Sequence, residues 1–416
     1  MTISDMVILV VTFFSSIAPS DLKAQLLSHL AIDGVELYSA EGYGERFTSY
    51  RTDGKQLIIF IGTGGTEQDV KGFLESVAPP SSVLLLSHPG NNSLPASMEI
   101  RSFLESAEID SEILHLTLSR LSQQLTHWVE FEKIISNIRN TRMVTFGESS
   151  SWLIASQIDY ERVKKNWGFK IIPQIMGLVK PKGRNSSQDT IVSHCKDSAD
   201  QVEVSEEAVS EAIQVQKLIE NVISLSKINA ITIQCFSLFE DTGITACHAL
   251  SILNEEEELV AGCEGDIPST FTMMVVKMLT GQPSFMANVI SVNEEHNTAI
   301  FAHCTIPRSM TETHDLVTHF ETDASVAIRG KLQPQDVTIV KIGGLGLSNY
   351  WISKGTILEN LQNEDGCRTQ IHVKIQQPVD YFLKRSLANH HIIVLGDHTK
   401  RIKSFLKFAL HKNPIE

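Results

Sequence analysis

The chain has 416 residues, of which 42% are hydrophobic and 20% are charged, and its formal net charge at neutral pH is −14. This composition is typical of a globular protein, and the length exceeds what one hydrophobic core usually supports, so two or three domains are expected. The acidic balance argues against nucleic-acid binding, because the sequence has no stripe of lysine and arginine to neutralise phosphates.

The first third of the sequence alternates apolar runs with amphipathic segments. The pattern predicts strands within Met6–Phe14, Leu57–Ile61 and Val83–Leu86, and helices near Leu22–Leu30, from Glu67 and from Pro95. A long helix over Asp110–Asn140 is predicted to close this unit. Continuous apolar strands between helices are typical of a parallel, doubly wound sheet. Residues 1–141 are therefore predicted to form an N-terminal α/β domain.

The same pattern restarts at Arg142 and predicts a central α/β domain over residues 142–298. Strands are predicted at Arg142–Gly147, Ala230–Phe236 and Leu259–Cys263, with helices at Ser205–Ser226 and Ile267–Leu279. Residues 181–203 are polar and rich in lysine, serine and aspartate, which predicts a loop.

The pattern of apolar residues in the sequence changes after residue 298. Short apolar runs, broken by glycine, proline and aspartate, occur at Ala299–Ala302, Ser325–Ile328, Val337–Ile342, Ile371–Ile375 and Ile392–Leu395. Short strands without intervening helices predict an antiparallel sheet or small barrel over residues 299–416, followed by a final helix at Arg401–Leu410. The predicted fold is thus two doubly wound α/β domains followed by a C-terminal antiparallel β-barrel-like domain.

Two further features bear on location. The six cysteines have no CxxC spacing, which argues against a zinc ribbon or a disulfide framework and favours reduced, buried thiols. The apolar run Met6–Phe14 has no basic segment before it and is too short to span a bilayer, so a buried strand is expected there rather than a signal peptide or membrane span. A cytoplasmic protein with no membrane partner is the resulting expectation.

The most informative residues for chemistry are Glu264, Asn288 and His303, with the pair His390–His391 further along. A carboxylate, an amide oxygen and one or two imidazoles suit Mn²⁺ or Mg²⁺ better than a thiolate zinc site does. Taken singly, each has an ordinary explanation: a surface acid, a turn residue or a buried core histidine. Glu264 nevertheless follows a predicted strand, where open α/β sheets bind ligands.

Neighbouring motifs favour structural roles. Asp266 precedes Ile267 and Pro268, which predicts a helix N-cap rather than a metal ligand. The turn Gly62–Gly65 lacks the lysine of a phosphate-binding loop, and the segment Gly147–Ser150 is most simply a turn between a strand and a helix. The sequence has no GxSxG motif, so a serine hydrolase is not expected.

In this order the motifs resemble the L-fucose isomerase / L-arabinose isomerase family, and its shorter fucose isomerase-like branch above all. The resemblance rests on Glu-Gly-Asp at 264–266, Phe-Met-Ala-Asn at 285–288, Ala-His-Cys at 302–304, and Asn-His-His at 389–391. It is supported by Asn92–Ala96, Cys235–Phe236, Thr318–Glu321 and Cys367–Thr369, and it covers most of the chain from about residue 57.

The resemblance implies a Mn²⁺-dependent aldose–ketose isomerase that acts on a small sugar through a metal-bound enediol. The family's metal ligands fall on Glu264, Asn288, His303, and either His390 or His391, with His390 preferred on local spacing. Glu264 and Asn288 occupy the two catalytic positions. The family also implies a homo-oligomer, a trimer or hexamer, in which a neighbouring subunit completes the cleft.

Asn288 departs from the family pattern, which has an acid at this position. An amide ligates a cation but cannot take a proton at neutral pH. Either Asp266, Glu321 or a histidine replaces the missing acid, or the chemistry is no longer simple isomerisation. The alternatives are a non-catalytic sugar-binding or regulatory protein on the same fold, and an enediolate lyase or epimerase.

Four residues are candidates for substrate binding. Arg368 and His319 are placed to contact sugar hydroxyls or an anionic substituent, although a structural ion pair or a capped strand end explains them equally well. Asn92 and Ser93 lie in the loop that the family uses at the subunit boundary.

Overall fold

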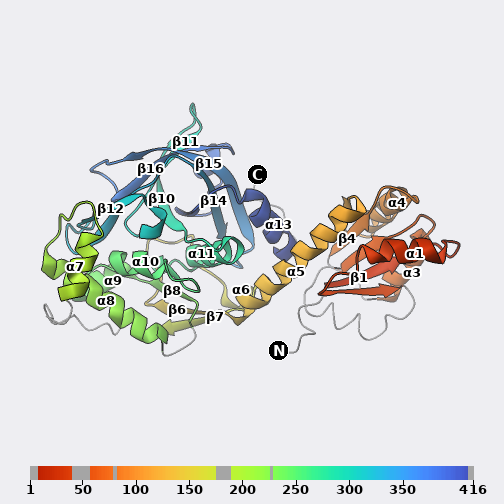
Figure 1. Ribbon diagram of the computed structural model, residues 1–416, viewed down its shortest axis with the longest axis horizontal. Helices are drawn as coiled ribbons and strands as arrows, with labels where there is room; N and C mark the ends of the chain where they lie inside the picture. The colour runs from red at the N-terminus through yellow and green to blue at the C-terminus, as the bar shows by residue number, and fades with distance from the viewer. Residues whose placement is uncertain (1–7, 40–56, 78–81, 175–188, 225–227, 411–416) are drawn as a thin grey trace. The chain divides into compact units, whose positions relative to one another are not determined.

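The structure is a computed structural model that describes residues 8–39, 57–77, 82–174, 189–224 and 228–410 (Figure 1). It divides into two compact units, Met1–Ser136 and Asn137–Glu416. The predicted domain limits at 141/142 and 298/299 stay predictions. Among the helices of the described residues, none is long and apolar enough to cross a membrane.

The first unit is built on a five-stranded parallel sheet in the order β2-β1-β3-β4-β5. Its strands are β1 (Ile8–Phe13), β2 (Val35–Ser39), β3 (Leu57–Ile61), β4 (Ser82–Ser87) and β5 (Asp110–His115). Its helices are α1 (Ser20–Ser28), α3 (Glu67–Ser76), α4 (Ser93–Ser106) and the start of α5 (Leu118–Asn140). The strand order is that of doubly wound folds, and β1, β3 and β4 are buried throughout because they read as unbroken apolar runs.

One prediction in this unit is wrong. The segment Asp110–His115 is a strand rather than the start of the long helix, which begins at Leu118. Strand β5 lies at the edge of the sheet and pairs in parallel with β4, with only partial burial of its side chains. Tertiary pairing therefore overrides the local helical preference of this half-polar segment.

The second unit begins with a four-stranded parallel sheet in the order β7-β6-β8-β9. Its strands are β6 (Arg142–Phe146), β7 (Lys170–Gln174), β8 (Ala230–Ile233) and β9 (Val260–Cys263). Its helices are α6 (Tyr160–Asn166), α7 (Asp189–Asp197), α8 (Glu206–Ser224), α9 (Cys235–Thr242), α10 (Cys247–Leu253) and α11 (Ile267–Thr280).

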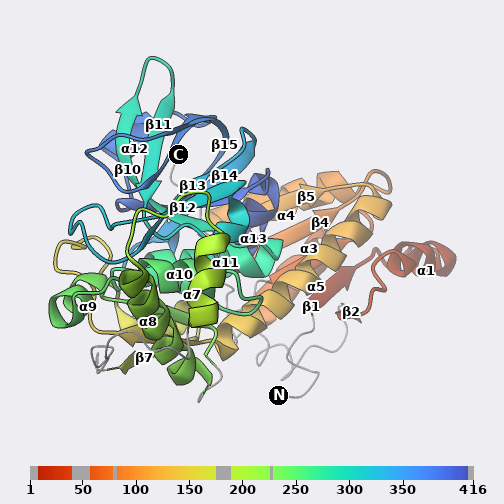
Figure 2. The same cartoon turned by 60° about the vertical axis from the view of Figure 1, so that its left-hand side comes forward.

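The predicted loop at 181–203 is also partly wrong, because residues 189–197 form helix α7; residues 181–188 lie outside the described part of the chain. Val192 and Cys195, one turn apart, are buried in the same apolar core as residues of α8. Helices α7, α8 and α10 lie side by side (Figure 2). Most other residues of α7 are polar, so this short apolar stripe does not stand out in the sequence.

The unit continues into a closed, six-stranded antiparallel barrel in the order β10-β11-β16-β15-β14-β17. Its strands are β10 (Phe285–Asn293), β11 (Thr298–His303), β14 (Asp336–Gly343), β15 (Asn349–Leu361), β16 (Thr369–Ile375) and β17 (His390–Leu395). A hairpin of β12 (Thr313–Val317) and β13 (Ala327–Lys331) and helices α12 (Asp380–Lys384) and α13 (Thr399–Leu410) complete the unit. Parallel sheets followed by an antiparallel barrel confirm the predicted fold class.

Helix α11 joins the sheet to the barrel. It packs against β8 and β9 on one side and against β14 and β17 on the other (Figure 1). Almost every residue of this helix is therefore buried. Because α11 starts directly after β9, the carboxyl end of that strand lies next to the barrel wall, and this junction holds the candidate site.

Candidate metal and sugar site

Glu264 occupies the turn between β9 and α11. Its backbone adopts the left-handed conformation, with φ of 59°, and Gly265 follows with φ of 68°. A non-glycine residue in this region is uncommon and costs about 1–3 kcal/mol unless the surroundings enforce it. Only 12% of the Glu264 side chain is exposed.

The neighbouring turn after β6 enforces this conformation. Ser150 N donates to the Glu264 carbonyl at 2.9 Å, and Ser149 Oγ donates to the Gly265 carbonyl at 2.6 Å. A Cβ atom on Gly265 would lie 2.5 Å from the Glu148 carbonyl oxygen, so only glycine fits. The segment 147–150 is thus a turn, as predicted, and it also fixes the candidate carboxylate.

Three barrel strands bring His303, His390 and Asn288 close to Glu264. Asn288 on β10 pairs with His390 on β17 and with Ala302 on β11, and His303 is the residue after Ala302. Cross-strand neighbours in a barrel are close in space although they are far apart in sequence. The barrel thereby places two imidazoles and one amide at the same end as the Glu264 turn.

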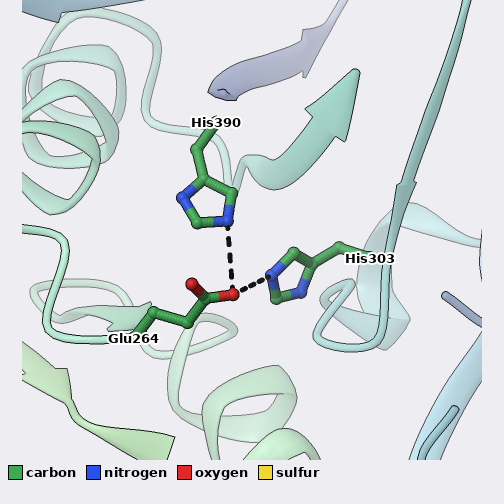
Figure 3. A group of neighbouring side chains, drawn as sticks. All are labelled: Glu264, His303 and His390. Atoms are coloured by element: carbon green, nitrogen blue, oxygen red, sulfur yellow. Dashed lines mark ion pairs between the residues drawn. The ribbon is translucent and has the colours of Figure 1, made fainter. Parts of the chain in front are cut away.

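Glu264, His303 and His390 converge on one point (Figure 3). The Glu264 Oε1 atom lies 3.5 Å from His390 Nε2 and 3.9 Å from His303 Nε2. The two rings are 5.4 Å apart between centroids. One ligand atom from each residue lies within 4.8 Å of the others, so the three residues form a buried group that can hold a metal ion.

Each of the three side chains is held by a second contact on its far side. Trp152 Nε1 donates to Glu264 Oε2 at 2.7 Å, which leaves Oε1 facing the histidines. His303 Nδ1 lies 3.0 Å from Thr305 Oγ1, and His390 Nδ1 lies 2.9 Å from Asp266 Oδ2. Metal-binding histidines usually engage a carboxylate, carbonyl or hydroxyl through the other ring nitrogen, which fixes the tautomer and aims the free nitrogen at the metal.

Asp266 has the predicted capping role and a second role as well. Its Oδ1 accepts from Ser269 N at 2.9 Å, which confirms the N-cap of α11. Its Oδ2 faces His390 and lies 3.7 Å from the fully buried ammonium of Lys341. Asp266 is itself fully buried, so it supports the site from behind and has no access to a bound sugar.

The charges of these groups depend on one another. Burial alone would raise the pKa of Glu264, but the neighbouring His390 and His303 and the Trp152 indole lower it to about 2. Burial would lower the pKa of His390, but the Asp266 and Glu264 carboxylates raise it to about 9. Burial and the proximity of His390 lower the pKa of His303 to about 3. Without a metal, His390 therefore carries a proton between two carboxylates.

A divalent cation fits this arrangement. His390 Nε2 is buried and, within the described residues, has no hydrogen-bond partner. Its nearest acceptor among the described residues is Glu264 Oε1, in an ion pair at 3.5 Å, and a buried nitrogen without a hydrogen bond is costly in a folded protein unless something else satisfies it. A carboxylate oxygen and two imidazoles are a donor set that borderline divalent cations accept, and a cation would replace the His390 proton.

The group opens into a pocket, which Glu264 and His303 line directly. Its other lining residues include aromatic, hydroxyl and titratable side chains, namely Phe236, Phe239, Thr245, Asn288, His319, Glu321 and Thr322. Five of the six cysteines also line it: Cys235, Cys247, Cys263, Cys304 and Cys367. All six cysteines are free thiols; five are buried, as expected, and Cys367 is partly exposed. Several cysteines flank the candidate site in the sequence, but their spacing does not predict that five of them line one pocket.

The structure places Asn288 in the same pocket as Glu264 and His303 and turns His391 away from them. Asn288 lines the pocket, and its Oδ1 accepts from Asn389 Nδ2 at 3.0 Å. His391 points to the opposite face of β17 from His390, because side chains alternate along a strand. Its Nε2 lies 3.1 Å from the Tyr381 hydroxyl among aromatic side chains, and burial lowers its pKa to about 3.

The predicted substrate-binding residues have different surroundings. His319 lines the pocket and contacts Thr322 Oγ1 at 3.1 Å through Nδ1. Arg368 donates to the Thr318 carbonyl at 2.8 Å and lies over the Phe320 ring at 5.9 Å. Its ion pair with Asp323 is long, at 3.9 Å, and the Asp323 side chain is 88% exposed.

Asn92 and Ser93 belong to the first unit. Asn92 is exposed in a left-handed conformation, with φ of 55°, at the start of α4. Ser93 is fully buried, and its hydroxyl donates to the Ile61 carbonyl and accepts from His88 N. The Ser93 hydroxyl is therefore committed to holding two loops of this unit together.

Two supporting residues escaped the sequence analysis. Trp152 lies on an irregular segment after β6, and a single exposed tryptophan gives no periodic signal. Lys341 lies in the apolar strand β14 and is fully buried, with Nζ donating to Ser269 Oγ at 2.7 Å. A lysine inside an apolar strand is the one signal that pointed to a buried carboxylate nearby.

Comparison with known proteins gives partial matches. No family model matches the chain. A sulfoquinovose isomerase of Alkalicoccus urumqiensis is 27% identical over 193 residues, which is 44% of this chain and 43% of that protein. Sulfoquinovose isomerases of Priestia megaterium and of a Clostridium species are 28% and 27% identical over 101 and 93 residues, or 24% and 22% of this chain and 22% and 21% of those proteins. The matched stretches span less than half of each relative, and over those stretches the chain is similar to sugar isomerases.

Proposed function

We propose that this protein is a divalent-cation-dependent aldose–ketose isomerase. The observation that carries the proposal is the buried group Glu264, His303 and His390, in which His390 Nε2 has no hydrogen-bond partner within the described residues. The partial similarity to sulfoquinovose isomerases supports the same reaction class. Mn²⁺ is the proposed cation, with Mg²⁺ as the alternative, and Asn288 is a further oxygen donor beside it.

Different residues of the pocket have different roles in the proposed isomerisation. A bound divalent cation would polarise the sugar carbonyl as a Lewis acid. Glu264 provides a carboxylate at the pocket surface, while Asp266 and Thr305 keep the two imidazoles oriented. The apolar walls formed by Phe236 and Phe239 limit water around the reacting carbons.

The proposed substrate is a sugar with an acidic substituent, and sulfoquinovose, which carries a sulfonate group, is the first candidate. Arg368 is the cation that would recognise such a group, together with His319. Arg368 is not itself a lining residue of the pocket, but it directly follows the lining residue Cys367. Its guanidinium donates to Thr318 and, among the described residues, its ion pair is the long contact to the exposed Asp323. A weakly neutralised guanidinium is well suited to bind a sulfonate or carboxylate.

The direct test is proton NMR of sugars incubated with the protein and Mn²⁺ in D₂O. We expect sulfoquinovose to show ketose signals and loss of the C2 proton, and non-sulfonated pentoses, hexoses and 6-deoxyhexoses to react more slowly. The Glu264→Gln variant is the matched control, since it keeps the size of the side chain and removes its charge. Absence of exchange on every sugar would contradict the proposal.

One observation favours a second candidate, a sugar-binding protein without catalysis. Asn288 is an amide at a position where the resembled family has an acid, and an amide cannot shuttle a proton. The same NMR experiment separates the two functions, because a binding protein would broaden sugar signals without exchanging the C2 proton. An enediolate epimerase or lyase would exchange the C2 proton and yield a different product.

We also propose a homo-oligomer, a trimer or hexamer, in which the exposed Asn92 of one subunit completes the cleft of another. The proposal rests on the resemblance and on the exposure of Asn92 at the start of α4. Light scattering at micromolar concentration should give a mass of at least three chains. A stable monomer would contradict it.

A further inference from the structure

The pocket needs a second group that can carry a proton, if the proposed isomerase function is correct. Isomerisation moves one hydrogen from C2 to C1 and one from O2 to O1. Glu264 accounts for one carboxylate, and the amide of Asn288 cannot hold the other proton at neutral pH. The missing group must line the same pocket, because proton transfer requires direct or one-water reach.

Asp266 does not meet this requirement. It is fully buried and is not among the pocket-lining residues. Both of its carboxylate oxygens are engaged, Oδ1 by Ser269 N and Oδ2 by His390 Nδ1 and Ser269 Oγ. Its carboxylate therefore orients His390 and cannot reach a sugar carbon.

Glu321 meets this requirement for a proton-carrying group that lines the pocket. It lines the pocket together with Glu264 and Asn288, and it comes from a separate segment, the turn that follows β12. It is exposed at the pocket surface, so it can exchange its proton with solvent between turnovers. No hydrogen bond or ion pair to Glu321 is seen within the described residues, so its carboxyl group is available to a ligand.

The electrostatic surroundings favour Glu321 over His319. Burial and the negative charge of Glu264 raise the pKa of Glu321, so its protonated form is more accessible than that of an ordinary surface glutamate. Burial and the nearby Arg368 lower the pKa of His319, so the protonated imidazole is disfavoured. The five cysteines of the pocket remain as alternatives, but several of them contact one another, as Cys235 and Cys263 do at 2.8 Å between sulfurs.

We propose that Glu321 is the second catalytic acid–base of this pocket and replaces the acid absent at position 288. One of the two carboxyl groups, Glu264 or Glu321, takes the proton from C2 and the other delivers a proton to C1. The hydroxyl proton passes from O2 to O1, so the sugar is neither oxidised nor reduced overall. The group that took the C2 proton then releases a proton to solvent and the group that protonated C1 takes one up, which returns both to their starting states.

The test is the rate of C2 deuterium exchange in sulfoquinovose with Mn²⁺ in D₂O, measured for the wild type and four variants. Glu321→Gln should slow exchange by about 100-fold or more, which is the usual contribution of a positioned acid–base. Glu312→Gln, at an exposed acid just before β12 and outside the pocket, should leave the rate unchanged. His319→Gln should slow exchange less than Glu321→Gln does.

A fourth variant separates a catalytic role from a structural one. In Glu321→Gln with Asn288→Asp, the restored acid should recover at least tenfold of the lost rate. Glu321→Gln alone should keep the wild-type thermal shift with Mn²⁺, because Glu321 is not one of the three grouped ligands.

The outcomes distinguish this inference from the proposed function. A wild type that exchanges no sugar overturns both. A wild type that exchanges sulfoquinovose while Glu321→Gln is within threefold of it overturns the role of Glu321 and leaves the isomerase intact. Loss of the Mn²⁺ thermal shift in Glu321→Gln, or no recovery in the double variant, also overturns the catalytic role.

Discussion

The loops at the carboxyl ends of the two parallel sheets differ in how the polar side chains near them are hydrogen-bonded. In the first unit, Ser93 and His88 at the ends of the strands bond to the backbone carbonyls of Ile61 and Gly62, at 2.5 and 2.9 Å. In the second unit, Glu264 follows β9 at the corresponding edge and faces His390 of the barrel strand β17 across 3.5 Å, and His390 Nε2 makes no hydrogen bond among the described residues. The first set of polar groups is hydrogen-bonded to the backbone, whereas the second set leaves one buried nitrogen, His390 Nε2, without a hydrogen bond among the described residues.

This difference explains why position in an α/β fold is a weak guide to function. Ligands bind at the carboxyl ends of parallel strands, but both sheets have polar residues there. A ligand gains free energy from a buried group that lacks a hydrogen bond, such as His390 Nε2 beside the Glu264 loop, whereas satisfied groups gain little from a new contact. The comparison predicts that ligand-dependent effects are confined to the second loop.

The largest expected effect separates two adjacent histidines. His390→Gln should weaken Mn²⁺ binding by more than about 100-fold, because loss of an outer contact alone typically costs 10–100-fold. His391→Gln removes the contact to the Tyr381 hydroxyl and should lower the thermal stability while keeping the Mn²⁺ response. Thermal unfolding with and without Mn²⁺ measures both variants. Equal loss of the response in both would show that the two faces of β17 do not differ as described.

An intermediate effect concerns pH. The pKa of His390 is 6.5 in its ordinary state and about 9 in the fold, so its stabilising contribution is complete below pH 6.5 and is lost as pH rises through 9. The loss is on the order of 3 kcal/mol, since one pKa unit corresponds to about 1.4 kcal/mol.

Melting temperatures between pH 6.5 and 8.5 provide the measurement. The metal-free protein should lose stability over this window, and Mn²⁺ should reduce the loss because it binds the neutral imidazole. The lowered pKa values of Glu264 and Asp266 act at acid pH, where their stabilisation is lost as pH falls, and so do not interfere. The same slope in His390→Gln would refute the assignment to His390.

The smallest expected effect concerns the first unit, in which the Ser93 and His88 side chains bond to backbone carbonyls. Ser93→Ala leaves His88 N and the Ile61 carbonyl without their buried partner and should lower the free energy of unfolding by about 1–3 kcal/mol. Ser106→Ala, which removes a hydroxyl at the surface end of α4, should change it by less. Urea unfolding measures both, and the Mn²⁺ response should match the wild type in each. A changed response in Ser93→Ala would link the two loops.

Much of the fold could be predicted from local sequence. Unbroken apolar runs such as Leu57–Ile61 identified the buried parallel strands, and the Asp266–Pro268 pattern identified the start of α11. The edge strand β5 and the helix α7 were missed, because their side chains are largely polar and their formation depends on pairing or packing with distant segments. The long strand β15 was also missed, since polar residues interrupt its apolar pattern.

The candidate site was only partly predictable. The order of Glu264, His303 and His390 along the chain suggested a metal group, but which face of β17 meets Glu264 depends on barrel register, and one residue of slip would exchange His390 for His391. The partners behind the ligands, Trp152 and Lys341, come from segments with no motif. Their roles follow only from the three-dimensional contacts.

The most direct test of the account is equilibrium binding of Mn²⁺ to the full chain, measured from the electron paramagnetic resonance signal of free Mn²⁺. The account predicts one Mn²⁺ per chain for the wild type and at least 100-fold weaker binding for Glu264→Gln, with unchanged circular dichroism. Glu312→Gln should bind as the wild type does. Equal binding by wild type and Glu264→Gln would contradict the claim that Glu264, His303 and His390 form the metal site.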